Sequence, residues 1–113
     1  MDGSLSDDPE YYEMVMRPIE QFLTEVFGHQ VSEAKLYVRA FYESARDGQI
    51  YPVPWTDEDI QHEGVGLAFA VQYHMTQPGK RRPHSPTFLN WRATCNAALR
   101  EGGALPRVPE ADI

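Results

Sequence analysis

Apolar residues recur at spacings of three and four in four segments of this 113-residue chain, and each segment lies between helix-start and helix-stop signals. Such spacing places side chains on one face of an α-helix, whereas a half-buried strand alternates with period two. Alternation with period two nowhere extends beyond a few residues. The pattern therefore predicts an all-α fold, a compact bundle of four to five helices with a proline-rich connector.

The first helix is expected to run from Pro9, with Asp8 as its N-cap, to about Phe27. Pro18 lies inside this pattern and has no backbone N–H to donate, so the helix should be kinked or split there. The better half should begin at Arg17 or Pro18. The apolar stripe of the whole segment comprises Tyr12, Val15, Ile19, Phe22, Leu23, Val26 and Phe27.

The second helix is expected to begin with Ser32 as N-cap, to pack Val31 against Leu36, and to stop at Gly48. Its predicted buried face comprises Leu36, Tyr37, Ala40, Phe41 and Ala45. The following segment, residues 50–55, contains two prolines and so cannot be a central strand. We expect an extended connector that lays aromatic surface over the core.

The third helix should begin at Thr56, whose spacing to Asp59 is that of a capping box, and continue to about Thr76. Gly64 falls on its apolar face, where close approach of another helix could offset the low helix propensity of glycine. The predicted buried face comprises Ile60, Gly64, Leu67, Ala68, Val71 and Met75, with Phe69 and Tyr73 beside it.

Ser85 and Pro86 predict the start of a fourth helix, which should end at Gly102. Its apolar stripe comprises Phe88, Trp91, Cys95 and Leu99. The length of the chain suits one domain. We expect a flexible N-terminus at 1–8, a single helical domain at 9–102, and an extended or disordered tail at 103–113.

The net charge of −7 is unevenly distributed. Residues 1–28 sum to −6 and residues 49–76 to −4, whereas residues 77–101 hold five bases against one acid and sum to +4. One short basic cluster on an acidic chain suits a protein partner better than an extended nucleic acid, which usually needs a basic face. Direct nucleic-acid binding is therefore not expected.

Lys80, Arg81 and Arg82, followed by His84, form this basic turn. Three adjacent bases are not needed for folding, so they are candidates for contact with a phosphate or with an acidic partner surface. The alternative is a solvated loop at a helix C-terminus, where cations are favoured anyway.

The acids of the first and third helices form a second candidate surface. A candidate acidic interaction face comprises Asp57, Glu58, Asp59, Glu63, Glu13 and Glu20. Complementarity with the helix dipole explains the acids of the third helix equally well. An aromatic surplus is a third candidate, because more aromatic side chains are present than four short helices must bury; the alternative is plain core packing. This surplus comprises Tyr11, Tyr12, Tyr42, Tyr51 and Trp55.

The four histidines lack the i, i+4 spacing and the neighbouring cysteine of a zinc site, so we expect surface or helix-end histidines, no metal and no cofactor. Cys95 lies on an apolar stripe and is expected to be a buried hydrophobe. An enzyme would need His74 or His84 to meet Cys95 and an acid in a pocket. The sequence favours a protein that is not an enzyme.

The lone cysteine and the polar N-terminus predict a cytoplasmic protein. The longest apolar run is five residues, against the roughly 20 that span a bilayer. No membrane association is therefore expected.

The segment PHSPTFLNWRATC resembles the Ser-Pro, Phe, Trp, Cys signature of phage helicase-loader proteins of the lambda replication P type. Ser85, Pro86, Phe88 and Trp91 carry the match. The chain departs from the signature at two points: Phe88 comes one residue too soon after Ser85, and Cys95 lies four residues after Trp91 rather than next to it. The resemblance implies an adaptor that grips a hexameric helicase or another replication protein.

These features favour a protein-binding adaptor or regulator of phage or plasmid origin that acts on a replication or other nucleic-acid-processing protein. The rival is an acidic inhibitor whose carboxylates imitate nucleic-acid phosphates and block a nuclease or a DNA-binding protein. The oligomeric state and the identity of the partner do not follow from the sequence.

Overall fold

The computed structural model describes residues 9–77 and 79–110, and every regular element in these ranges is helical. The all-α prediction is therefore confirmed. The predictions for residues 1–8 and 111–113, including the Asp8 cap, lie outside the described residues. The elements are α1 (Pro9–Tyr11), a π-helical turn η1 (Tyr12–Met16), α2 (Arg17–Glu25), α3 (Val31–Arg46), α4 (Asp57–Glu63), a 3-10 turn η2 (Gly64–Gly66), α5 (Leu67–Met75) and α6 (Pro86–Glu101).

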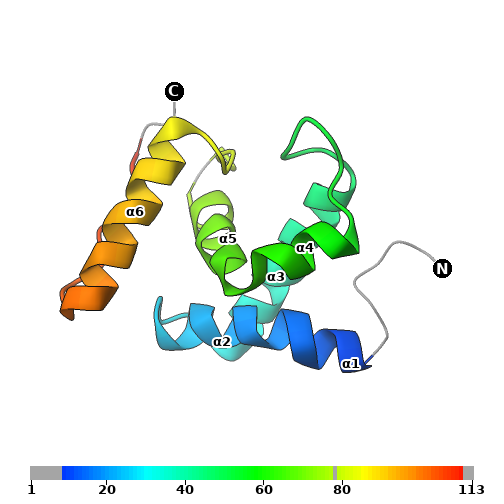
Figure 1. The fold of residues 1–113 in the computed structure, drawn as a ribbon, viewed down its shortest axis with the longest axis horizontal. Helices are drawn as coiled ribbons and strands as arrows, with labels where there is room; N and C mark the ends of the chain where they lie inside the picture. The colour runs from blue at the N-terminus through cyan, green and yellow to red at the C-terminus, as the bar shows by residue number, and fades with distance from the viewer. Residues whose placement is uncertain (1–8, 78, 111–113) are drawn as a thin grey trace.

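Helix α5 lies at the centre of the molecule, with α2 and α3 packed against it and α6 flanking it (Figure 1). Its sequence, LAFAVQYHM, is apolar on almost every side, and seven of its nine residues are buried. A helix that is apolar all round is typical of a position inside a core rather than on its surface. The chain is therefore organised around a short central helix.

The α-helical half of the first segment, α2, begins at Arg17, as predicted from Pro18. The backbone stays right-handed helical across the boundary, so the helix changes from π-type to α-type turns there rather than breaking. The five residues before α2 form a π-helical turn. A proline ring clashes with the carbonyl four residues earlier and offers no N–H, so a widened turn at this point has a local cause. Val15, Ile19 and Leu23 of the predicted stripe are buried.

Helix α3 begins two residues earlier than predicted, and its buried face is different. Gln30 precedes its first residue and makes no side-chain cap, so Ser32 is not the N-cap. Val31 and Leu36 are 61% and 68% exposed, which makes the predicted staple wrong. The buried face comprises Ala34, Val38, Phe41, Tyr42 and Ala45. Both faces satisfy helical spacing, and contact with α2 and α5 decides between them.

The predicted third helix is two helices. Gly64 takes φ +58° and ψ −139°, and the chain passes through η2 before α5 begins. A β-carbon at Gly64 would meet no atom within 4 Å, so the expected close helix contact is absent there. Gly66 is the closely approached glycine, because its β-carbon would lie 2.5 Å from Nη2 of Arg92. The capping box of Thr56 and Asp59 is confirmed.

Helix α6 begins as predicted, with the Ser85 hydroxyl accepting a hydrogen bond from the Phe88 amide and with Pro86 at the first helical position. Gly102 ends it in a left-handed conformation, φ +74°. Leu99, predicted to be buried, is 40% exposed. The segment 103–110 is not helical, and it runs back along α6, where Nε1 of Trp91 donates to the Pro106 carbonyl.

The helices of the described part of the chain are all too short or too polar to cross a membrane.

Candidate functional site

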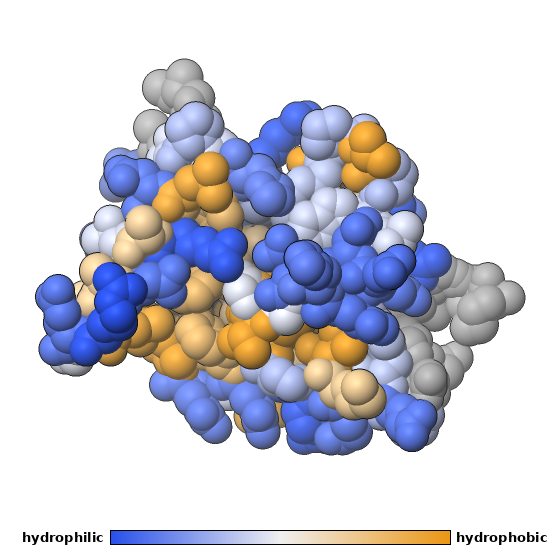
Figure 2. Space-filling view, viewed as in Figure 1, coloured by the Kyte–Doolittle hydropathy of each residue, from blue (hydrophilic) through white to orange (hydrophobic). Residues whose placement is uncertain are grey.

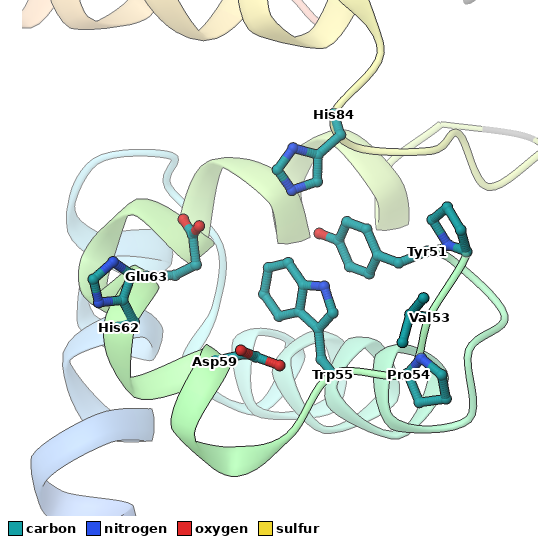
Figure 3. A pocket seen from close by; sticks show the side chains of 9 residues that line it. Tyr51, Val53, Pro54, Trp55, Asp59, His62, Glu63 and His84 are labelled. Atoms are coloured by element: carbon teal, nitrogen blue, oxygen red, sulfur yellow. The ribbon is translucent and has the colours of Figure 1, made fainter.

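A surface pocket of about 370 Å³ lies between the proline-rich connector, α4 and the loop before α6 (Figure 3). Its walls mix aromatic, aliphatic and ionisable side chains. They comprise Tyr51, Pro52, Val53, Pro54, Trp55, Asp59, His62, Glu63 and His84.

The connector is held in place at both ends of its path over α3. The Trp55 amide donates to the Ala45 carbonyl at 2.9 Å, and Gly48, at φ +76°, lets the chain leave α3. A β-carbon at Gly48 would come within 3.2 Å of Pro54. The backbone bends at residues 49–53 instead of running extended as predicted. The two prolines fix their own φ angles within this bend, which helps to hold the aromatic side chains on either side of them in position.

Tyr51 and Trp55 stack with ring centroids 4.2 Å apart and an interplanar angle of 11°. His84 approaches both rings at steep angles, with centroid distances of 5.1 Å to Tyr51 and 6.1 Å to Trp55. His84 also adopts φ +78°, which is uncommon for residues other than glycine, although histidine adopts it more often than most. In this backbone conformation the His84 ring packs against the aromatic pair.

Only 5% of Tyr51 is exposed. Its hydroxyl is buried and has no hydrogen-bond partner among the described residues. Figure 3 shows this hydroxyl directed toward Trp55, His84 and Glu63. Burial, with a further contribution from the charge of Glu63, raises the pKa of Tyr51, so the phenol stays neutral. Buried hydroxyl groups are normally satisfied, and the exceptions often mark a functional position.

Two carboxylates lie beside the aromatic pair (Figure 3). Asp59 accepts a hydrogen bond from the Thr56 amide through Oδ2, which fixes its orientation. Within the described residues, Glu63 has neither a hydrogen bond nor an ion pair within 4 Å, and it is half-buried. The pocket therefore combines an electron-rich aromatic surface with negative charge.

The residues of the predicted basic turn lie in different surroundings in the structure. Lys80 and Arg82 are exposed, and Lys80 adopts φ +50°. Arg81 is half-buried, with its guanidinium 6.0 Å from the centroid of the Tyr73 ring. His84 lies in the aromatic pocket instead of beside these bases.

Several acids of the candidate acidic face contact other side chains of the same molecule. Glu20 is 6% exposed and accepts hydrogen bonds from Tyr12 and Lys35. Glu13 pairs with Arg17 at 2.9 Å. Asp57 accepts a hydrogen bond from the Tyr42 hydroxyl. Asp59 and Glu63 line the pocket, and Glu58 is exposed on α4.

His74 corrects the expectation of surface histidines, because it is 6% exposed. Its Nδ1 donates to the Arg81 carbonyl, and its ring lies 5.7 Å from that of Phe41. Burial lowers the pKa of His74, so the neutral form is favoured.

Cys95 is fully buried, as predicted. Burial raises the pKa of its thiol to about 11, which leaves almost no thiolate at neutral pH. Neither His74 nor Cys95 lines the aromatic pocket. Among the residues that the structure describes, no three His, Cys, Asp or Glu side chains gather as metal ligands would.

The sequence indicated the aromatic surplus at Tyr51 and Trp55 but not the pocket. Tyr42, in the same surplus, is 1% exposed and belongs to the core. His84 was assigned to the basic turn by its neighbours in the chain. Its contact with residues about thirty positions earlier depends on the path of the loop, which no local pattern encodes.

No protein-family model matches the chain, and no significant match was found among curated proteins or solved structures.

Proposed function

We propose that the protein is a non-enzymatic adaptor or regulator that binds another protein through the connector, α4 and His84. The carrying observation is the pocket between them, where Tyr51 stacks on Trp55 and its buried hydroxyl has no hydrogen-bond partner. Tyrosine and tryptophan are enriched where protein surfaces meet, because they offer a large apolar area together with a polar group. The pocket is therefore suited to an anchor side chain of a partner.

Exposed apolar surface adjoins the pocket and extends the contact area. Val53 of the connector is 69% exposed, and Figure 2 shows a hydrophobic spot over this part of the molecule within hydrophilic surroundings. Because Val53 and Pro54 also line the pocket, their aliphatic surface is continuous with the aromatic pair.

A protein with basic surface is the proposed class of partner. The chain carries a net charge of −7, and opposite charge speeds encounter and fixes orientation. Replication and other nucleic-acid-processing proteins of phages or plasmids carry such surface, in keeping with the resemblance to helicase loaders. The matching residues have structural roles here: Ser85 caps α6, and Phe88 and Trp91 are buried.

The rival proposal, an inhibitor that imitates DNA through its acids, receives less support. Imitation of phosphates requires carboxylates that face solvent freely. Glu20, Asp57 and Glu13 are instead held by side chains of the same molecule.

Affinity capture from a lysate of the source cells, followed by mass spectrometry, tests the proposal. Val53→Lys should remove the specific partner from the captured proteins, because it places a cation at the rim of a site proposed for a basic partner. Leu36→Lys is the matched control, because Leu36 is equally exposed at 68%, lies on α3 and does not line the pocket. Equal capture by wild type and Val53→Lys, or equal loss in both variants, would overturn the assignment of this surface.

A further inference from the structure

We infer that the pocket between the connector and α4 binds the guanidinium group of an arginine on the partner protein. This inference rests on the proposed function and specifies the chemistry of the anchor. Four independent features of the pocket fit such a group.

The first feature is the aromatic surface. Trp55 is half-buried and lines the pocket, with Tyr51 stacked against it. Tryptophan binds cations over its ring more strongly than the other aromatic residues do. A guanidinium is planar and weakly hydrated, so it stacks on such a ring with less desolvation than an ammonium group.

The second feature is the pair of carboxylates. Glu63 has no charged partner within 4 Å among the described residues, and Asp59 is held in orientation by the Thr56 amide. A carboxylate accepts two parallel hydrogen bonds from a guanidinium, which adds directional selectivity to the charge attraction. The same charges disfavour a phosphate or another anion in this pocket.

The third feature is the Tyr51 hydroxyl, which is buried without a partner and directed into the pocket (Figure 3). A phenolic hydroxyl both donates and accepts. It can therefore accept an N–H of the guanidinium or donate to a backbone carbonyl of the partner. Binding would satisfy a polar group that the free protein leaves unsatisfied.

The fourth feature is the aliphatic rim formed by Val53 and Pro54. An arginine covers apolar surface with its methylene stem while its charged end reaches a polar site. Arg92 is the cation of the chain itself near this region. Its guanidinium lies 5.6 Å from the centroid of the Phe69 ring, and its charge partly offsets that of Glu63 at the Tyr51 hydroxyl. Arg92 does not line the pocket and forms no ion pair with Glu63 within 4 Å among the described residues.

The test is an NMR titration of the full chain with the peptide acetyl-Gly-Gly-Arg-Gly-Gly-amide at low ionic strength. We expect a saturable shift of the Trp55 indole N–H signal, with a dissociation constant on the order of a millimolar. The Trp91 indole N–H, bonded to the Pro106 carbonyl inside the fold, is the internal control and should not move. The matching citrulline peptide, which is neutral and of the same shape, should cause no saturable shift.

Glu63→Gln should weaken binding of the arginine peptide about fivefold or more, because it removes the free carboxylate. Glu58→Gln is the matched control, since it makes the same charge change on α4 outside the pocket. Equal affinity for the arginine and citrulline peptides, no shift of Trp55, or equal effects of the two variants would overturn the inference. If Val53→Lys still abolishes capture while the peptide titration fails, the surface is correct and the arginine assignment is wrong.

Discussion

Two buried tyrosine hydroxyls have opposite surroundings. Tyr42 donates to Asp57 and accepts from Nη1 of Arg46 at 3.2 Å, whereas Tyr51 has no partner. Tyr42→Phe should lower the free energy of unfolding by about 1.5–3 kcal/mol, because it removes hydrogen bonds to charged groups. Tyr51→Phe should leave it unchanged or raise it by up to about 1 kcal/mol, because it removes an unsatisfied buried group.

Urea denaturation of the two variants and the wild type measures this difference. Both substitutions delete one oxygen from a buried ring, so the loss of packing is the same. If Tyr51→Phe is as destabilising as Tyr42→Phe, the Tyr51 hydroxyl has a partner in the folded protein.

Because His74 is buried, the stability of the fold should depend on pH. Burial holds its pKa below the ordinary value of about 6.5, so below that pH the unfolded chain binds more protons than the folded one. The free energy of unfolding should therefore fall as the pH drops from about 6.5 through the folded pKa. His74→Asn keeps a donor toward the Arg81 carbonyl but cannot titrate, so its loss of stability in acid should be smaller.

Melting temperatures measured between pH 7.5 and pH 5 test this expectation. His62→Asn, on the exposed surface of α4, should keep the slope of the wild type. An unchanged slope in His74→Asn would show that other groups cause the loss of stability in acid.

At the scale of elements, residues that terminate helices were easier to predict than the faces that helices bury. Thr56, Asp59 and Ser85 cap helices through hydrogen bonds to residues three positions away, so these caps can be predicted from the local sequence. The buried face of α3 could not be predicted in the same way. Leu36 and Val38 both fit helical periodicity, and only the packing of α3 on α2 and α5 selects Val38.

The break between α4 and α5 depends on one glycine. Gly64 has φ +58° and ψ −139°, a conformation that residues with a β-carbon adopt only at a cost of about 1–3 kcal/mol. Gly64→Ala should lower the free energy of unfolding by that amount although the new methyl group meets no atom. Gly103→Ala, at a glycine without positive φ and also in open space, should change it by less than about 0.5 kcal/mol.

Chemical denaturation of the two alanine variants checks this prediction. Equal stability of Gly64→Ala and Gly103→Ala would mean that the chain rebuilds the turn as a continuous helix, the arrangement that the apolar periodicity alone predicts.

For the whole molecule, the sequence predicted the helical class because that class follows from local periodicity. The candidate site was only partly predictable. Tyr51 and Trp55 stood out as aromatic surplus, but their meeting with His84 and Glu63 requires the connector, α4 and the loop before α6 to converge. The basic turn, the most conspicuous cluster in the sequence, contributes only Lys80 and Arg82 as exposed bases.

Reversing the charges of Lys80 and Arg82 tests whether the partner binds at the pocket or at the basic turn. The double variant Lys80→Glu, Arg82→Glu should capture the same partner as the wild type, with an affinity within about threefold, since neither side chain lines the pocket. Surface charges away from the contact act mainly through screened, long-range attraction. Loss of the partner in this variant would place the interface at the basic turn.

The central claim is that the partner inserts a cationic side chain beside Glu63. The most direct measurement is the affinity of the purified partner for wild type, Glu63→Gln and Glu58→Gln, determined by titration calorimetry at low salt. We predict that Glu63→Gln binds about tenfold more weakly and that Glu58→Gln binds within about twofold of wild type. Equal affinities of the two variants would contradict the account.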